Sequence, residues 1–302
     1  MNAKKELFTK VILSFSGKRF AVIMLIFVSQ QLVLMKETFL QTVKIPGIVY
    51  SDFETQKIIG EHFILEHGLC YIISGNLKVT EAGQTRIFGT GDLVFYRKNF
   101  LSKFTKIPGK KEPFRSVTVI FDRDVLMQFS QQYNVVYDKP YPLKDAVLQL
   151  KNDVLLENFF QTLLPYFNSA LPEQLITLKK QEALMLLLQV NPDLRNVLLD
   201  FNQPGKIDLE VFMQQNFKFN VELKKLAFLT GRSLATFKRD FEQIFHTSPN
   251  RWLQKRRLEE AHYLIKEKKK RPSDVYHELG FESISHFSYS FKKLFGVNPS
   301  AI

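Results

Sequence analysis

Short apolar segments separated by turn sequences fill the chain between about residue 60 and residue 122. The turns are rich in Gly, Asn, Asp and Pro, as in Ser74-Gly75-Asn76 and Gly89-Thr90-Gly91-Asp92. Strands are expected between the turns, over residues 62–65, 69–73, 77–80, 85–88, 93–96, 100–104 and 116–121. Short strands at this spacing predict a small β-sandwich or barrel.

From about residue 123 to residue 200 the apolar positions recur with the period of an α-helix. Helices are predicted over 125–133, 154–167 and 175–190. The last of these is apolar over most of its surface and therefore needs cover, for which two interpretations stay open. It either packs into the core of its own chain or forms the seam of a dimer.

The C-terminal third contains one pattern twice, with an offset of 50 residues between the copies. The first copy consists of Leu229, Ser233, Phe237, Phe241, Phe245 and Pro249, and the second of Leu279, Ser283, Phe287, Phe291, Phe295 and Pro299. Three Phe at intervals of four predict a helix with an aromatic core face, and the Ser can cap its start. Gly231 and Gly280 stand where a tight turn between helices needs a glycine. The pattern therefore predicts two helix-turn-helix units.

The outward face of each repeated helix carries the candidate DNA-contacting residues, assigned from a rotation of about 100° per residue. In the first unit this face is predicted to hold Arg232, Ala235, Thr236 and Arg239, with Lys238 on its flank. In the second unit it is predicted to hold Ser285, His286 and Tyr289, with Ser288 on its flank and Lys292 and Lys293 near phosphate. Small and basic residues suit a major groove, where Arg and Lys reach guanine O6 and N7. An ordinary solvated face is the alternative interpretation.

A long helix is predicted between the two units, from Arg251 to about Lys268, with Pro249 near its first turn. Roughly 18 residues at 1.5 Å per residue give a length of about 27 Å. Successive major grooves on one side of B-DNA are about 34 Å apart. One chain could therefore place two recognition helices in adjacent grooves.

Charge is distributed unevenly along the chain, whose formal net charge is +12. The net charge is +4 in residues 1–34, +1 in 35–200 and +7 in 201–302. An anionic partner, here double-stranded DNA, is therefore expected at the C-terminal third.

Few residues suit catalysis or metal binding. His62 and His67 flank Glu66, but no other His occurs before residue 246, so the metal set of a cupin cannot be completed there. Both are expected to be surface or loop histidines. Cys70 is the single cysteine and is predicted to be a small buried residue of a strand. One cysteine is too few for the zinc-cysteine cluster of a repair methyltransferase, so that class of protein is excluded. The sequence predicts no enzyme, no catalytic residue, no metal and no cofactor; an enzymatic cupin is the minor alternative.

Residues 1–34 combine scattered Lys and Arg with the apolar run 20–28, as targeting segments do. That run is too short to span a membrane, which needs about 20 residues. Met35 begins a more ordinary sequence, so 1–34 are predicted to be an over-extended reading frame. A docking helix and a membrane anchor, which would make a membrane-anchored regulator, are the alternatives. The expected location is the cytoplasm.

Several stretches of the C-terminal third resemble the AraC/XylS family of transcription regulators. They are 231–241, 248–253, 257–261, 280–287 and 291–300. The resemblance implies two helix-turn-helix units joined by a linker helix, each reading one major groove. By position it implies base reading by Ala235, Lys238 and Arg239, and by Ser285, Ser288 and Tyr289. Three residues depart from the family pattern: His246 replaces the usual Gly, Tyr276 a small Ala, and Tyr289 a common Arg.

Residues 35–200 resemble, more loosely, the cupin-like regulatory domain of the ExsA type, in strand spacing and in the sequence of 91–97. This implies dimerisation and input from a ligand or a partner protein. The expected fold is multidomain α and β, with a cupin-like β regulatory domain over 35–122. A helical dimerisation segment over 123–200 and a DNA-binding domain over 201–302 would follow. The expected function is a sequence-specific DNA-binding transcription regulator, an activator as is common in that family. Its expected partners are DNA, RNA polymerase, a second copy of the chain, and a small-molecule effector or regulatory protein.

Overall fold

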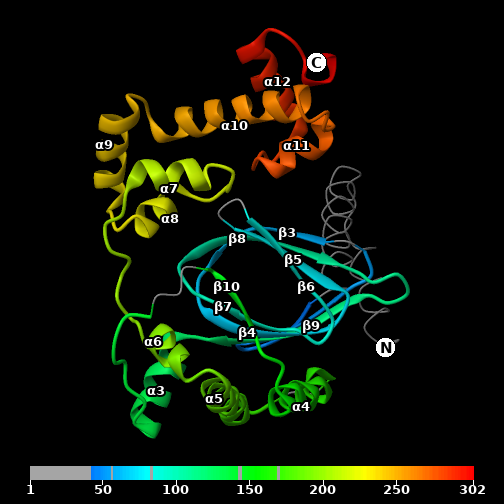
Figure 1. Cartoon of the computed structure of the whole chain (residues 1–302), viewed down its shortest axis with the longest axis vertical. Helices are drawn as coiled ribbons and strands as arrows, with labels where there is room; N and C mark the ends of the chain where they lie inside the picture. Colours follow the sequence, from blue (N-terminus) through cyan, green and yellow to red (C-terminus); the bar gives the residue numbers. More distant parts are fainter. Residues whose placement is uncertain (1–41, 56, 82–83, 142–144, 169–170) are drawn as a thin grey trace, which may run out of the picture. The chain divides into compact units, whose positions relative to one another are not determined.

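The computed structural model describes residues 42–302 apart from 56, 82–83, 142–144 and 169–170 (Figure 1). Residues 43–302 form one unit. Residues 1–34 lie outside the described residues, so the three interpretations of this segment, a reading-frame extension, a docking helix and a membrane anchor, stay predictions. Within the described part, no helix combines the length and the apolar character needed to cross a bilayer.

The described residues of the N-terminal half form two antiparallel sheets. The strands are β1 Thr42–Ile45, β2 Ile48–Phe53, β3 Lys57–Ile64, β4 His67–Ser74, β5 Asn76–Glu81, β6 Gln84–Phe88, β7 Leu93–Tyr96, β8 Phe100–Ile107, β9 Phe114–Phe121 and β10 Val147–Leu150. One sheet has the order β1-β2-β9-β4-β7-β10 and the other the order β3-β8-β5-β6. All seven predicted strands are confirmed, and so is the fold class. The sequence pattern missed β1, β2 and β10.

Strand β4 explains why the apolar run around Cys70 does not alternate with polar residues. Its Cys70 and Ile72 belong to the core between the two sheets. Its Leu69 and Tyr71 point the other way, into a second core shared with the helices that follow. Because both faces of the strand are covered, every position favours an apolar side chain. Cys70 is only 1% exposed, as predicted for a buried small residue.

Helices cover the outer face of the six-stranded sheet (Figure 1). They are α3 Arg123–Tyr133, α4 Val154–Leu163, the 3-10 turn η1 Leu164–Asn168, α5 Glu173–Val190, the turn η2 Pro192–Leu194 and α6 Arg195–Leu198. The apolar helix α5 buries Ile176, Leu184 and Leu187 in this core, so the core interpretation accounts for most of its apolar surface. Leu178 and Met185 of α5 stay exposed. The segment is not purely helical, since β10 within it pairs with β7.

The C-terminal third is helical, as predicted. Its helices are α7 Leu209–Asn216, α8 Leu223–Leu229, α9 Leu234–Phe245, α10 Pro249–Lys266, α11 Pro272–Glu278 and α12 Ile284–Phe295, and a short turn η3 Pro299–Ala301 follows. Phe237 and Phe241 are fully buried in one core, and Phe287 and Phe291 in another. The repeated Phe pattern therefore marks two separately packed units. Helix α10 connects them (Figure 1).

His67 corrects one expectation, because it lies neither at the surface nor in a loop. It opens β4 and is 1% exposed, and its Nδ1 accepts a hydrogen bond from the backbone N–H of Lys98 at 3.3 Å. Its ring stacks on Phe95 with 5.6 Å between centroids. Burial, aided by the charges of Lys98 and Arg97, lowers the pKa of His67 from 6.5 to about 3. The imidazole is therefore neutral in the folded protein.

The buried His67 should make stability depend on pH. Below pH 6.5 the His67 imidazole binds a proton in the unfolded chain, whereas in the folded chain it binds one only near pH 3. Acid therefore favours unfolding. Relative to His67→Phe, the wild-type protein should lose unfolding free energy as the pH falls through 6.5, with a slope that approaches about 1.4 kcal/mol per pH unit near pH 5. Urea unfolding of both proteins at pH 7, 6 and 5 measures this loss. Parallel pH curves would contradict it.

Candidate nucleic-acid interface

The first repeated helix, α9, begins as its sequence predicts. The hydroxyl Oγ of Ser233 accepts a hydrogen bond from the backbone N–H of Thr236 at 3.2 Å, which caps the helix. Gly231 has a φ of +65°, and a Cβ there would come within 2.4 Å of the carbonyl carbon of Gly205. The turn therefore requires glycine for its backbone conformation and for space. His246 ends α9 with a φ of +53°, taking the left-handed conformation that a glycine favours.

The outward face of α9 is open to solvent. Ala235, Lys238 and Arg239 are exposed, and the Arg239 side chain keeps 68% of its surface in solvent. Thr236 is half-buried, and its hydroxyl is hydrogen-bonded to Ser233 at 2.9 Å. This face presents small residues beside two cations, a combination that fits the width and the acceptor groups of a major groove.

Arg232 does not belong to this face, contrary to expectation. Its side chain is only 6% exposed, and its Nε donates to a carboxylate oxygen of Asp240 at 3.1 Å. Its Nη1 donates to the carbonyls of Ile207 and Thr230. The hydrogen bond from Arg232, together with the nearby Lys206, lowers the pKa of the Asp240 carboxyl. Arg232 precedes the cap of α9, where helical angles do not apply, so it turns inward and holds the start of the helix.

The second repeated helix, α12, repeats the arrangement. Ser283 caps it by accepting from the backbone N–H of His286 at 3.4 Å. Of the candidate residues, Ser285, His286, Tyr289, Lys292 and Lys293 are exposed, whereas Ser288 is half-buried. Ile284 and Leu294 of the same helix are exposed as well. Tyr289 is 69% exposed, so it faces solvent. The half-buried Tyr276 packs against the core of this unit, in which α11 and α12 are in contact.

Two further cations lie beside α12 and were missed by the sequence reasoning. Arg251 and Lys255 of α10 share a shallow hollow of about 420 Å³ with His286, Tyr289 and Lys293. Both are exposed. The only sequence signal was their spacing of four on one face of the linker helix, which is common on solvated helices.

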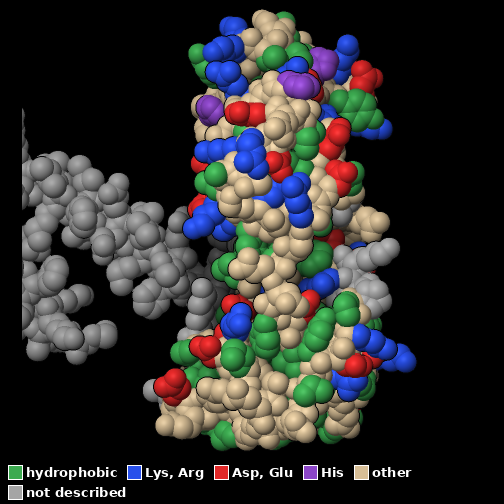
Figure 2. Space-filling model, turned by 90° about the vertical axis from the view of Figure 1, so that its left-hand side faces the viewer, with side chains coloured by type: hydrophobic (Ala, Val, Ile, Leu, Met, Phe, Trp, Pro, Cys, Tyr) green, Lys and Arg blue, Asp and Glu red, His purple; other side chains and the backbone are tan. Residues whose placement is uncertain are grey.

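Lys and Arg side chains recur over the helices of the C-terminal third on the face shown in Figure 2. The two capped helices lie within residues 201–302, the stretch that carries the net charge of +7. A basic surface around paired helices of this kind is the electrostatic footprint of a DNA-binding protein.

Two protein families match separate parts of the chain. The ExsA N-terminal regulatory domain matches residues 67–197, and a helix-turn-helix domain matches residues 226–302. The chain belongs to the AraC family of transcription regulators. Its matched C-terminal domain contains α9, α10 and α12, the elements that carry the exposed cations.

Three relatives of this AraC-family chain are similar over most of their length. The transcriptional regulator ExsA of Pseudomonas aeruginosa is 27% identical over 243 residues, which are 78% of this chain and 85% of ExsA. The thermoregulatory protein LcrF of Yersinia pestis is 27% identical, and the virulence regulon transcriptional activator VirF of Yersinia enterocolitica is 26% identical. Each of these matches spans 78% of this chain and 90% of the relative. These matches confirm the prediction of a transcription regulator rather than an enzyme.

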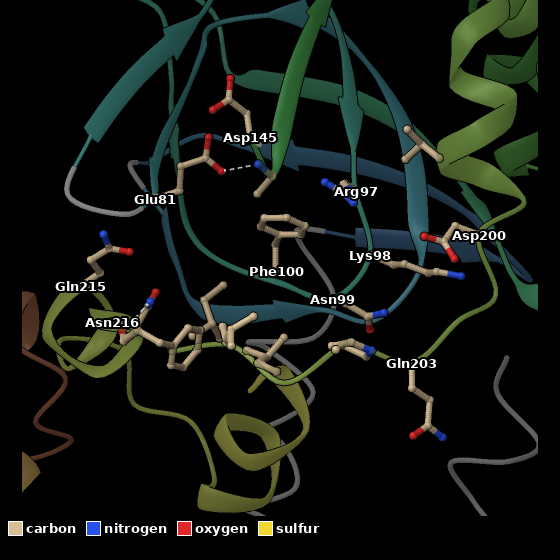
Figure 3. Close-up of a pocket in the computed structure, with 18 of the residues that line it drawn as sticks. Glu81, Arg97, Lys98, Asn99, Phe100, Asp145, Asp200, Gln203, Gln215 and Asn216 are labelled. Carbon is tan, nitrogen blue, oxygen red and sulfur yellow. Dashed lines mark hydrogen bonds between the residues drawn. The ribbon is translucent and has the colours of Figure 1, made fainter. Parts of the chain in front are cut away.

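A hollow of about 710 Å³ lies between the strands and α7 of this AraC-family protein (Figure 3). Glu81 and Asp145 lie on one side of it, and Lys98 and Asp200 on the other. Glu81 accepts a hydrogen bond from the backbone N–H of Ala146 at 3.0 Å. The wall of the hollow thus carries both signs of charge beside apolar side chains such as Phe100 and Leu101.

The four-stranded sheet touches both helix-turn-helix units. Leu101 of β8 is buried in the core of the first unit, and the ring of Phe63 meets that of Phe228 edge-on at 6.1 Å between centroids. The ammonium of Lys103 donates to the carbonyl of His277, in the second unit, at 3.2 Å. The regulatory strands and the DNA-binding helices of this family member are therefore in physical contact.

Lys292→Ala should weaken binding to all DNA sequences about equally, because the exposed ammonium lies at the end of α12, where it can meet phosphate. The slope of log K against log salt should decrease in magnitude by about 1. Titrations of one specific and one unrelated duplex at several salt concentrations measure this. A loss confined to the specific duplex would assign Lys292 to base reading instead.

Proposed function

We propose that this AraC-family regulator is a transcription activator that reads two short DNA boxes about one helical turn apart. The observation that carries the proposal is the pair of Ser-capped helices, α9 and α12, each with a buried aromatic face and an exposed polar face. The linker helix α10 between them has 18 residues, or about 27 Å. That length is compatible with adjacent major grooves about 34 Å apart when the width of each unit is added.

In this proposal Ala235, Lys238 and Arg239 read bases from α9, with Thr236 beside them. Ser285, Ser288 and Tyr289 read bases from α12, with His286 beside them. Arg and Lys reach guanine, the small residues admit the helix and meet thymine methyl groups, and Ser bonds to either type of base. Lys292, Lys293, Arg251 and Lys255 neutralise phosphates around the second box. Arg232 acts indirectly, by holding the start of α9.

Residues 35–200 would control the DNA-binding domain, 201–302. Supporting this are the contacts of Phe63, Leu101 and Lys103 with the two helix-turn-helix units. A polar small molecule in the hollow of Figure 3, or a regulatory protein on the same strands, would shift these contacts and with them DNA binding. As an activator, the DNA-bound protein would recruit RNA polymerase; the relative VirF is a transcriptional activator of a virulence regulon.

We propose a homodimer built on the exposed side of α5, where Leu178 is 59% and Met185 43% exposed one heptad apart. Leu178→Glu should convert the dimer to a monomer, because a charge placed in an apolar seam loses hydration without gaining a partner. Light scattering after gel filtration at tens of micromolar measures the mass. Ile87→Glu, on the exposed side of β6, is the matched control and should stay dimeric. A monomeric wild-type protein would contradict the proposal.

Selection of bound sequences from a random DNA pool, with the full chain at near-physiological salt, tests the two-box proposal. Enrichment of two boxes about one turn apart would support it. Enrichment of a single box would limit base reading to one unit. Absence of enrichment, with and without added effector candidates or cell extract, would count against sequence-specific binding.

A further inference from the structure

One side chain of the linker helix connects both helix-turn-helix units. Arg257 lies midway along α10, and its Nε and Nη2 donate to the carbonyls of Phe217 and Phe219, at 2.7 and 2.8 Å. These carbonyls belong to the loop between α7 and α8, in the first unit. Its Nη1 donates to the carbonyl of Gly280, in the turn of the second unit, at 3.3 Å. A planar guanidinium can bind three fixed acceptors in this way because its donors point in set directions.

Arg257 stands where α10 passes from one core to the other. Leu253, one turn earlier, is buried in the core of the first unit. Leu258, the next residue, is buried in the core of the second unit. The two cores do not merge, so apolar packing positions each unit on its own half of α10. Besides the continuous helix α10, the polar contacts at this junction are what connects the two units here.

The loop between α7 and α8 also contacts the turn before α12 directly, without α10 between them. Gly280 has a φ of +74°, and a Cβ on it would lie 2.7 Å from the carbonyl oxygen of Lys218. The side-chain amide of Asn220 donates to a carboxylate oxygen of Glu282 at 3.0 Å. Lys218 in turn forms an ion pair with Glu260 of α10 at 2.8 Å. Three kinds of contact therefore connect the two units at this junction: a close backbone approach, an amide–carboxylate hydrogen bond and the hydrogen bonds of Arg257.

We propose that Arg257, Asn220 and Glu282 form an inter-unit latch that fixes α9 and α12 in one relative orientation. They are positioning residues, because none of them lies on the outward face of α9 or α12. The latch makes the protein select the distance between the two DNA boxes as well as their sequences. It rests on the proposed two-box reading, since only a reader of two boxes can measure their spacing.

The sharpest test places a repulsive charge in the latch and then removes its partner. Asn220→Asp puts a second carboxylate beside Glu282, and both positions are exposed, so the fold should tolerate it. The preference for the selected spacing over spacings longer or shorter by two base pairs should fall by about threefold to tenfold, the value of one or two hydrogen bonds. Affinity for a single box should stay unchanged. Adding Glu282→Gln restores an amide–carboxylate pair with the roles exchanged, and should restore the spacing preference.

Arg257→Gln should give a larger loss of spacing preference, and Lys255→Gln is its matched control. Lys255 lies on the same helix and its removal deletes one positive charge, but its side chain is 70% exposed and pairs with Glu259 of α10 itself. Lys255→Gln should therefore lower affinity at every spacing alike. A spacing preference that survives both Asn220→Asp and Arg257→Gln would overturn the latch.

Distances between spin labels at Gln243→Cys and Lys293→Cys give a readout that needs no DNA. Both sites are exposed, while the native Cys70 is buried and will not react under mild labelling. The wild-type latch should give one narrow distance distribution, Asn220→Asp a broad one, and the double variant a narrow one again. This pattern, in a protein that selects no DNA, would support the latch while refuting the proposed function. Unchanged distributions in all variants of a two-box binder would refute the latch alone.

Discussion

Phe241→Ala should destabilise the first helix-turn-helix unit by about 3–5 kcal/mol, the usual cost of truncating a buried aromatic ring. Phe241 has no exposed surface, and its ring lies 4.3 Å from that of Phe245 and 5.7 Å from those of Phe237 and Trp252, between centroids. Removing it leaves a cavity at the centre of the core that positions α9. A loss of this size is a large part of the stability of an ordinary domain, so DNA binding by this unit should fail as well.

The single tryptophan of the chain makes this prediction straightforward to measure. Trp252 meets Phe241 edge-on, so urea unfolding followed by its fluorescence reports on the first unit. Ile244→Ala is the matched control on the same helix, because Ile244 is 41% exposed and its truncation should cost little. If Phe241→Ala unfolds within about 1 kcal/mol of the wild-type value, the aromatic core does not hold this unit together.

Arg239→Ala should weaken binding to the selected DNA by about 1–3 kcal/mol, or roughly fivefold to more than a hundredfold. The side chain is 68% exposed on the outward face of α9, and its contact with Asp240, at 3.6 Å, is too weak and too solvated to retain it. Its guanidinium can therefore swing to guanine O6 and N7. Titrations against the selected duplex and against duplexes altered one base at a time, at fixed salt, should show relaxed preference at one position.

Two other substitutions distinguish base reading by Arg239 from a contribution of its charge alone and from a structural role of a neighbouring arginine. Arg239→Lys keeps the charge but loses the planar pair of donors, so it should bind the backbone normally and still lose base preference. Arg232→Ala should instead lower the stability of α9, because Arg232 is buried on Asp240 and on two carbonyls. An unchanged base preference in Arg239→Ala would remove this residue from the reading face.

Periodicity was sufficient wherever the stabilising contacts are local in the chain. The Phe series at intervals of four predicted α9 and α12 with their inward faces, and Ser233 and Ser283 were expected as caps and are caps. The seven strands were predicted because turn residues with clear backbone preferences separate them. Helix α10 was predicted from the absence of Gly and Pro together with apolar residues at helical spacing.

The unexpected features depend on partners that no local pattern specifies. Strand β10 is four residues long and is a strand only because β7 offers it a free edge. His67 is buried although histidine favours neither surface nor core, because Lys98 supplies a donor and Phe95 a ring. Helical phasing assigned Arg232 to the outward face, but its position before the cap let it turn towards Asp240, eight residues on.

The order of residues alone thus indicated the family, the two repeated units and the candidate DNA-facing residues, because these follow from spacing along one helix or one turn. Only the tertiary structure decided which of those residues are available and how the two units are joined. Arg257 shows the reason most clearly: its acceptors lie 40, 38 and 23 residues away, in two different units. A local sequence pattern cannot predict these hydrogen bonds, because only folding brings the three acceptors next to Arg257.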